Sequence, residues 1–446
     1  MKPELLSPAG TLKNMHYAFA YGADAVYAGQ PRYSLRVRNN DFKLDNLQTG
    51  IDEAHRQGKH FYLASNIAPH NSKVKTYIHD LAPVIAMGPD ALIMSDPGLI
   101  MMVREQWPDM PVHLSVQANA VNFATVKFWA KQGIQRIILS RELSLEEVQE
   151  IREACPETEL EVFVHGSLCI AYSGRCLLSG YINHRDPNQG TCTNACRWKY
   201  QAHEAREDEN SDIIAVNAIP THPQSTPEPA LGKGQTTDNI YLLQEQGRPD
   251  QYMPAFEDEH GTYIMNSRDL RAVQHVKRFS DMGIASLKIE GRTKSFYYVA
   301  RTAQIYRQAI DDAAEDRQFN RGLMDSLENL ASRGYTEGFY RRHVHDEYQN
   351  YERGNSKGTQ QQFVGEILDV YNGQMTIDVK NHFALGDSLE LITPAGNRTF
   401  VLNNLENKQG MAVDVAPGSG HIVKVPVPEG MTINEYTLLV RNLPAA

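Results

Sequence analysis

The sequence predicts an α/β protein built on a (β/α)8 TIM-like barrel, with a cysteine-bearing insertion between strands 7 and 8 and a small C-terminal all-β barrel domain. Three observations support this fold class. Short β-rich runs alternate with amphipathic helical patterns over the first 316 residues, which is typical of parallel βαβ units. Four cysteines cluster directly after the seventh run. From Gln361 onward the pattern changes to short strands separated by turns, which favours an all-β domain.

Seven β-rich runs precede the cysteines, and an eighth follows them after a long gap. They span Leu5–Pro8, Ala25–Gly29, His60–Asn66, Ala91–Asp96, Val112–Gln117, Arg136–Glu142, Leu160–Gly166 and Ser286–Gly291. Eight parallel strands are the number that closes a barrel of this type.

Amphipathic stretches between these runs predict the helices of the barrel. They cover Leu12–Tyr21, Leu44–Gln57, Lys73–Met87, Ala120–Gln132, Leu145–Cys155 and Ser295–Asp316. Apolar residues recur in them at helical spacing. Ser144 followed by Glu147 is a capping-box pattern, which predicts where the fifth of these helices begins.

The predicted domain boundaries follow from these patterns. Residues 1–316 form the barrel, including an insertion at 167–260, residues 317–360 form a helical connector, and residues 361–446 form the β domain. Within the insertion, the polar and Pro-rich stretch from His203 to Asp250 predicts a mobile loop. The strands of the β domain are expected at Phe363–Val370, Gln374–Val379, Asp387–Ile392, Arg398–Leu402, His421–Val425 and Tyr436–Val440.

Length and composition restrict the class of protein. With 446 residues, 41% of them hydrophobic, the chain can build a barrel, which takes roughly 250 residues, and a further domain. No run approaches the roughly 18 apolar residues of a membrane span, and Met1–Glu4 carry no apolar signal core, so we expect a soluble, cytoplasmic protein. The formal charge of −10 argues against a general nucleic-acid coat, because non-specific binding needs many cationic contacts to phosphate. Any RNA site must therefore be local.

Cys169, Cys176, Cys192 and Cys196 fall within 28 positions, with gaps of six, fifteen and three residues. A cytosolic thiol pool keeps most disulfides reduced, so metal binding explains this cluster better than disulfides do. Thiolates suit zinc or an iron-sulfur cluster, and the absence of paired C-x-x-C knuckles favours the latter only modestly. Small buried thiols are the structural alternative, but polar and turn-forming residues surround these cysteines. Cys155, beside Pro156, is expected to be structural.

Polar residues gather at the C-terminal ends of the predicted strands, namely Ser7, Asn66, Asp96, Gln117, Arg141, Glu142, His165 and Glu290. Barrel enzymes place their chemistry at this end. The candidate catalytic residues are His165, Glu290, Gln117 and Arg141. The alternative for any one of them is an internal salt-bridge layer that only closes the barrel.

Lys288, Glu290 and Arg292 alternate along the eighth strand and therefore share one face. We expect a charged layer at the top of the barrel. His165 could act as an acid, a base or a hydrogen-bond donor, although a lone histidine is more often a satisfied structural group.

Two stretches, Arg32–Arg38 and Arg333–Arg342, interleave basic and aromatic residues. Such interleaving can bind phosphates and stack bases, but it is more commonly a solvated face. Arg36, Arg38, Arg341 and Arg342 are the candidate RNA contacts.

The run Glu161–Cys169, followed by Ser173–Cys176 and Arg185–Arg197, resembles the signature of the peptidase U32 family. The resemblance extends to Glu4–Gly10, Ser115–Asn119 and Lys288–Arg292. With the β-rich tail it covers essentially the whole chain.

This resemblance implies an RNA hydroxylase rather than a peptidase. It implies a [4Fe-4S] cluster on the four clustered cysteines, and oxygen-independent, prephenate-dependent hydroxylation of the wobble uridine of tRNA to 5-hydroxyuridine. The implied partners are the tRNA anticodon region, prephenate and a helper protein or electron donor. With prephenate as the co-substrate, we expect Lys288, Arg292 or Arg141 to pair with its carboxylates. Relatives of this kind hydroxylate ribosomal RNA or ubiquinone precursors.

Two other functions stay open. A peptidase finds little support, because the chain has no H-E-x-x-H and no G-x-S-x-G, and a Cys169–His165 protease would leave three cysteines unexplained. A non-catalytic tRNA-binding scaffold with a structural metal is the second alternative.

Overall fold

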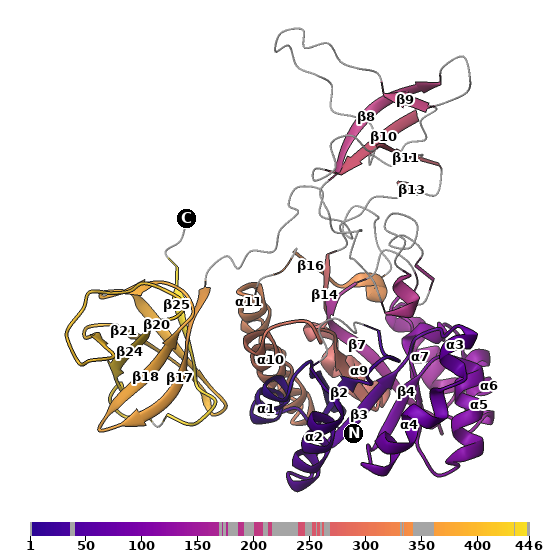
Figure 1. Ribbon diagram of the computed structural model, residues 1–446, viewed down its shortest axis with the longest axis horizontal. Helices are drawn as coiled ribbons and strands as arrows, with labels where there is room; N and C mark the ends of the chain where they lie inside the picture. Colours follow the sequence, from indigo (N-terminus) through magenta and orange to yellow (C-terminus); the bar gives the residue numbers. More distant parts are fainter. Residues whose placement is uncertain are drawn as a thin grey trace.

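The computed structural model of the chain is shown in Figure 1. It describes residues 2–35, 41–168, 172, 175–176, 186–190, 200–207, 213–215, 240–245, 252–255, 257–258, 261–262, 268–330, 332, 334–341, 361–431 and 433–443. Between 200 and 262 only the backbone of the strands is described. Within this part of the chain, no helix has the length and apolar character needed to cross a membrane.

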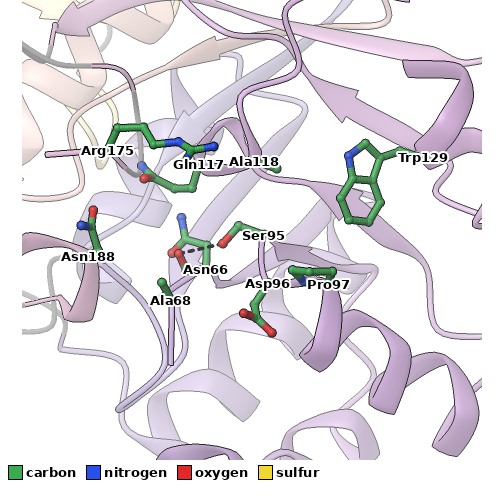
Figure 2. Close-up of a pocket in the computed structure, with 10 residues that line it drawn as sticks. All are labelled: Asn66, Ala68, Ser95, Asp96, Pro97, Gln117, Ala118, Trp129, Arg175 and Asn188. Carbon is green, nitrogen blue, oxygen red and sulfur yellow. Dashed lines mark hydrogen bonds between the residues drawn. The ribbon is translucent and has the colours of Figure 1, made fainter. Parts of the chain in front are cut away.

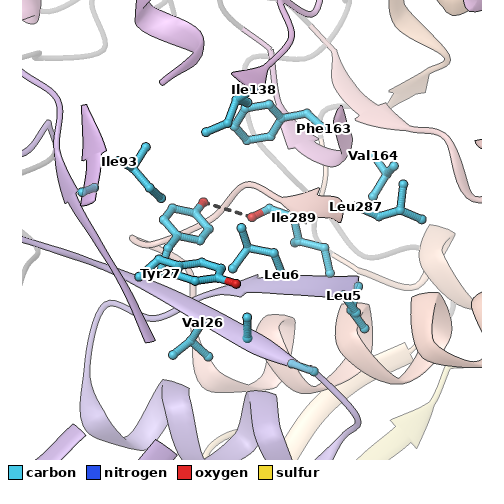
Figure 3. Packing of buried hydrophobic residues seen from close by; sticks show 14 of the residues in the cluster. Leu5, Leu6, Val26, Tyr27, Ile93, Ile138, Phe163, Val164, Leu287 and Ile289 are labelled. Carbon is cyan, nitrogen blue, oxygen red and sulfur yellow. Dashed lines mark hydrogen bonds between the residues drawn. The ribbon is translucent and has the colours of Figure 1, made fainter. Parts of the chain in front are cut away.

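Eight parallel strands form a closed barrel, which confirms the predicted fold class. The strands are β1 (Glu4–Pro8), β2 (Ala25–Gly29), β3 (His60–Ser65), β4 (Ala91–Met94), β5 (Val112–Leu114), β6 (Arg136–Ile138), β7 (Glu159–Ser167) and β15 (Ser286–Ile289). They pair in this order, and β15 pairs with both β7 and β1, which closes the ring. Figure 3 shows side chains from several strands filling the interior, among them Leu6 of β1, Tyr27 of β2 and Phe163 of β7.

Helices cover the outside of the barrel. They are α1 (Leu12–Ala20), α2 (Leu44–Arg56), α3 (Asn71–Val74), α4 (Tyr77–Ala86), α5 (Pro97–Gln106), α6 (Phe123–Lys131), α7 (Leu145–Ala154), α9 (Val276–Met282) and α10 (Phe296–Ala314). The capping box of α7 forms as predicted between Ser144 and Glu147. The long helix expected at Lys73–Met87 is two helices, α3 and α4.

Helix α5 is absent from the helical stretches predicted above, and it begins with Pro97-Gly98, a pair that often marks a turn. In the structure Pro97 occupies the first turn of α5, where its missing N–H costs nothing. The Asp96 side chain caps this helix by accepting a hydrogen bond from the Leu99 N–H, 2.9 Å away.

The prediction of a mobile loop from His203 to Asp250 is wrong where this stretch is described. Strands β8 (Tyr200–Glu207), β9 (Ile213–Ala215), β10 (Ile240–Glu245) and β11 (Tyr252–Ala255) form an antiparallel sheet in the order β11-β10-β8-β9. Figure 1 shows this sheet apart from the barrel. The sequence of β10, Ile-Tyr-Leu-Leu, has the composition of a strand, but the polar residues around it dominated the prediction.

The connector contains α11 (Gly322–Glu328) and a short strand, β16 (Tyr335–Thr336), that pairs with β14 (Asp269–Arg271). Strand β14 in turn pairs antiparallel with the end of β7. The sheet therefore continues past the closed barrel at the level of the insertion.

The C-terminal domain is all-β and antiparallel, as predicted. Its seven-stranded sheet has the order β21-β20-β25-β17-β18-β24-β22. These strands span Gly396–Val401, Ser388–Thr393, Leu438–Asn442, Gln361–Tyr371, Gln374–Val379, Ile422–Pro426 and Glu406–Asn407. The sheet encloses its own apolar cluster.

This domain packs against α1 and α10, as Figure 1 shows. The Tyr21 hydroxyl lies 2.8 Å from the carbonyls of both Ile392 and Tyr436. The rings of Tyr297 and Phe363 stack with centroids 4.8 Å apart. Buried aromatic and hydrogen-bonded contacts of this kind fix the domain on the barrel.

Candidate functional site

The lower end of the barrel, where the strands begin, holds a network of charged side chains. The Lys288 ammonium lies 2.8 Å from the Glu161 carboxylate, and both side chains are nearly inaccessible to solvent. Arg136 lies 2.6 Å from Glu4 and 3.6 Å from Glu161. Burial alone would raise the pKa of Glu4, but His60 and the Arg136 guanidinium lower it to about 2. The charges in this network compensate one another.

Lys288 therefore lies inside the barrel and does not face the mouth. Its ammonium is 4.3 Å from the centroid of the Tyr27 ring, and burial lowers the pKa of Lys288 while Glu161 opposes the shift. The three residues of the expected charged layer lie at different levels of the barrel. Lys288 belongs to the internal network, whereas Glu290 and Arg292 follow β15 at the mouth. The structure places no accessible cation at Lys288 for a co-substrate.

His165 lies on β7, as the sequence predicts, but its side chain points toward α10 and not toward the mouth. A β-bulge shifts the register so that Lys288 pairs with Phe163 and Ile289 pairs with His165. The bulge removes one step of the alternation, and the imidazole packs against α10. The centroids of the Tyr298, Tyr306 and Tyr335 rings lie 5.4 to 5.8 Å from it.

Burial dominates the environment of this histidine. The side chain is 1% exposed, and burial lowers the pKa of His165 to about 3. The imidazole is thus neutral at physiological pH, and it is not among the described residues that line the cavity at the mouth. This burial favours a structural role for His165, although its Nε2 atom has no hydrogen-bond partner among the described residues.

Arg141, Glu290 and Arg292 gather at the mouth around Tyr27. Arg141 donates to the Ser167 carbonyl at 2.7 Å and lies over the Phe163 ring at 4.7 Å. Arg292 donates to the Leu35 carbonyl and lies 5.9 Å from the Tyr27 ring centroid. Burial raises the pKa of Tyr27, the Glu290 charge raises it further, and the two arginines oppose the shift.

The backbone of Glu290 is held firmly on both sides. Its N–H donates to the His165 carbonyl at 2.9 Å, and its carbonyl accepts from the Tyr298 hydroxyl at 2.9 Å. Gly166 makes this approach possible, because a Cβ there would lie 2.5 Å from the Glu290 carbonyl oxygen. The end of β7 and the turn that follows β15 are therefore held together.

Three further polar side chains near the mouth are buried without a hydrogen-bond partner among the described residues. They are Ser7 after β1, and Gln30 and Ser34 after β2, each 0 or 1% exposed. An unpaired buried polar group costs free energy, so such groups point to an unseen water or ligand.

A cavity of about 370 Å³ opens over the ends of β3, β4 and β5 (Figure 2). Its polar lining consists of Asn66, Ser95, Asp96, Gln117, Arg175 and Asn188, and Trp129 of α6 lies at the opposite end from Arg175. Asn66 braces this region, since it accepts from the Leu35 N–H and donates to Ser115, both at 3.2 Å. Asn66, Asp96 and Gln117 are three of the polar strand-end residues singled out from the sequence.

The other wall of the cavity comes from the cysteine segment. Asn188 donates to the Cys176 carbonyl at 3.0 Å, and its own carbonyl accepts from the Ala68 N–H at 3.0 Å. Gln189 donates to the Ala68 carbonyl as well. Cys176 is thereby tied to the loop after β3, at the barrel mouth.

Cys169, Cys192 and Cys196 lie outside the described residues, so the proposed ligand set is represented by Cys176 alone. Within the described part of the chain, no group of three or more His, Cys, Asp or Glu side chains forms a metal site. Cys176 is partly exposed and sits where the loops of the mouth converge. Four thiols suit an iron-sulfur cluster by their chemistry, and Cys176 is the one whose position is described. Cys155 is buried.

Of the candidate RNA contacts, only Arg341 lies within the described residues; Arg36, Arg38 and Arg342 do not. The Arg341 side chain is 65% exposed and lies 2.9 Å from Glu337. Sequence analysis missed Trp129 as a site residue, because its position in a helical pattern carries no sign of the cavity. Arg175 and Asn188 belong to the polar and turn-forming residues that surround the clustered cysteines in the sequence.

Two family models match the chain: Peptidase family U32 at residues 10–350, and Peptidase family U32 C-terminal domain at residues 359–440. The tRNA hydroxylation protein P of Escherichia coli is 65% identical over 99% of this chain and 97% of its own length. The protein of the same name from Haemophilus influenzae is 62% identical over 99% of this chain and 96% of its own. The 23S rRNA 5-hydroxycytidine C2501 synthase of Escherichia coli is 28% identical, over 90% of this chain and 54% of its own.

Proposed function

This chain belongs to the peptidase U32 family, and on that premise we propose that it is a cytoplasmic tRNA-modifying enzyme that hydroxylates the wobble uridine to 5-hydroxyuridine. The observation that carries the proposal is the identity of 65% over nearly the whole chain with a tRNA hydroxylation protein. The similarity to an rRNA 5-hydroxycytidine synthase supports pyrimidine C5 hydroxylation as the chemistry.

The reaction sets a requirement for a second substrate. Replacing the C5–H of uridine with C5–OH removes two electrons from the base; if water supplies the oxygen, two electrons and two protons remain for an acceptor. We propose that the reaction proceeds without molecular oxygen and depends on prephenate, and that prephenate or a helper protein accepts these two electrons and two protons.

Cys169, Cys176, Cys192 and Cys196 would hold a [4Fe-4S] cluster at the barrel mouth. Such a cluster supplies one-electron transfer or a binding site for a ligand when bound. The anchoring of Cys176 through Asn188 and Ala68 supports this position.

Arg141 and Arg292 are the cations best placed for the two carboxylates of prephenate, because guanidinium groups bind carboxylates with two parallel hydrogen bonds. They approach Tyr27 from β6 and β15. Glu290 lies beside them, partly exposed, where it can accept or return a proton. Gln117 lines the adjacent cavity.

The anticodon region of tRNA is the proposed RNA partner, because a loop already presents unstacked bases at modest cost. A peptidase remains the alternative suggested by the family name. The described residues offer no Cys–His pair for it, since His165 is turned away from the mouth. A non-catalytic tRNA-binding scaffold would need the same fold but no modified product.

The substrate is tested by comparing nucleosides of cells with and without the gene, in normal and prephenate-starved growth. We expect 5-hydroxyuridine derivatives to disappear from tRNA without the gene and to fall on starvation. Loss of a hydroxylated rRNA nucleoside or quinone alone would retain the chemistry and reject tRNA as substrate. Unchanged levels in all three pools would reject the hydroxylase.

The cluster is tested by anaerobic purification followed by absorption and electron paramagnetic resonance. Iron and acid-labile sulfide should co-purify. Cys176→Ser should sharply lower both, whereas Cys155→Ser is the matched control and should leave them unchanged. Stoichiometric zinc without sulfide would contradict the assignment.

A further inference from the structure

The cavity over β3, β4 and β5 contains polar groups of two kinds. Some are used by the protein itself: Asn66 bonds Leu35 and Ser115, and Ser95 donates to the Asn66 carbonyl at 3.2 Å. The side chains of Gln117 and Arg175 have no partner among the described residues, although both line the cavity. These two groups are available to a ligand.

The charge of the cavity restricts what that ligand can be. Its described lining contains one cation, Arg175, and one carboxylate, Asp96, which caps α5. The two formal charges cancel, so the cavity offers little to a dicarboxylate. The pair Arg141 and Arg292, at the neighbouring strand ends, suits an acid far better.

We infer that this cavity receives the pyrimidine ring of the target nucleotide and that Gln117 reads its Watson–Crick edge. The inference rests on the proposed function and adds to it the place where the base binds. A primary amide carries an acceptor and two donors. It can accept from the uracil N3–H and donate to the adjacent O4 at once.

The rest of the cavity fits the same ligand. Enzymes that modify a base bind it out of the stack, read its edge by hydrogen bonds and place its faces against aromatic or apolar side chains. Trp129, Pro97 and Ala118 supply apolar surface, with Trp129 at one end (Figure 2). The volume of about 370 Å³ lies within the range of small-ligand sites, roughly 300–1,000 Å³.

Arg175 links the cavity to the cysteine segment. It precedes Cys176 in the chain and lines the cavity at the end away from Trp129 (Figure 2). A base held between Gln117 and Arg175 would lie beside the proposed cluster ligand. This adjacency is what chemistry on the bound ring requires.

Photocrosslinking tests the inference without relying on turnover. The full-length, anaerobically prepared protein is mixed with an anticodon stem-loop RNA that carries 4-thiouridine at the wobble position, irradiated, digested and mapped by mass spectrometry. We expect crosslinks in the peptides that contain Gln117 or Trp129. Crosslinks confined to other peptides, such as those of the C-terminal domain, would overturn the inference while leaving tRNA as the substrate.

Gln117→Leu sharpens the test, because it removes the hydrogen bonds and keeps a similar size. Loss of a two-bond base contact should reduce the crosslink yield about tenfold or more, with RNA affinity, melting temperature and iron content nearly unchanged. Gln132→Leu, the same change at the far end of α6, is the control and should behave as wild type. A wild-type yield in Gln117→Leu would overturn base reading by this residue.

Failure of the proposed function and failure of the base-binding inference give different results. If wild-type protein binds no RNA and cellular tRNA is unchanged without the gene, the proposed function fails and the inference with it. If tRNA loses its 5-hydroxyuridine but the crosslinks map elsewhere, only the inference fails.

Discussion

Buried polar side chains are paired with one another at the lower end of the barrel, whereas several of them lack a described partner at the mouth. At the lower end Glu4, Arg136, Glu161 and Lys288 are buried or nearly so, and they pair with one another. At the mouth Ser7 and Gln30 are buried without a described partner, and Gln117 lines a cavity. Paired charges close the structure, whereas polar groups left over are available to a ligand. Stability should therefore depend on the lower end and activity on the mouth.

The largest expected effect is at the lower end. Glu161→Ala leaves the Lys288 ammonium buried without its partner, which should cost about 3–5 kcal/mol of unfolding free energy. Urea denaturation followed by circular dichroism measures it. The double variant Glu161→Leu with Lys288→Met should recover most of the loss, because it removes both charges. A single variant as stable as wild type would contradict the pairing argument.

His165 lies between the two regions and should behave as a structural residue. Its pKa is about 3 in the folded protein and about 6.5 when unfolded. Between these values the unfolded state binds more protons, so His165 lowers stability as the pH falls below about 6.5 and contributes no such loss above it. At pH 5 the loss is about 2 kcal/mol.

His165→Phe keeps the ring contacts and removes this titration. When the pH is lowered from 7.5 to 5, wild type should lose about 2 kcal/mol more unfolding free energy than the variant. Urea denaturation at both pH values measures the difference. Identical pH dependence in the two proteins would contradict a buried neutral imidazole.

Glu290→Gln addresses the mouth. The Glu290 side chain is partly exposed, so the change should alter stability by no more than about 0.5 kcal/mol. We expect at least a tenfold loss of tRNA hydroxylation, about 1.4 kcal/mol of transition-state stabilisation. Glu150→Gln, an exposed position on α7, is the matched control. Full activity in Glu290→Gln would assign this carboxylate to the structure.

The smallest effect is expected at Arg341. If this exposed side chain contacts phosphate, Arg341→Gln should weaken tRNA binding and lower the slope of log affinity against log salt by about one. Arg56→Gln, at the lower end of α2, should leave the slope unchanged. Fluorescence anisotropy over a salt series distinguishes the two variants.

Sequence patterns were sufficient for the barrel because its signals are local. Each strand is a short apolar run, and the spacing of apolar residues identifies most of the helices. The exceptions have local reasons as well: Pro97-Gly98 resembles a turn but begins α5, and the β10 run lies among polar residues.

Side-chain direction at the site could not be predicted in the same way. A single bulge between β7 and β15 changes the face on which His165 lies, and no local pattern reveals a bulge in a pairing that spans more than a hundred residues. Lys288 and Arg292 share one face of the sequence pattern, but Lys288 lies inside the barrel and Arg292 lies at its mouth. The cavity joins Gln117, Trp129 and Arg175 from three segments, so only the folded chain brings them together.

We propose that this chain hydroxylates tRNA through a cysteine-bound cluster at the barrel mouth without using molecular oxygen. The most direct test is the tRNA nucleoside composition of deletion cells that are grown anaerobically and complemented with wild type, Cys155→Ser or Cys176→Ser. We predict that wild type and Cys155→Ser restore 5-hydroxyuridine derivatives and that Cys176→Ser does not. Full restoration by Cys176→Ser, or none by wild type when oxygen is excluded, would contradict the claim.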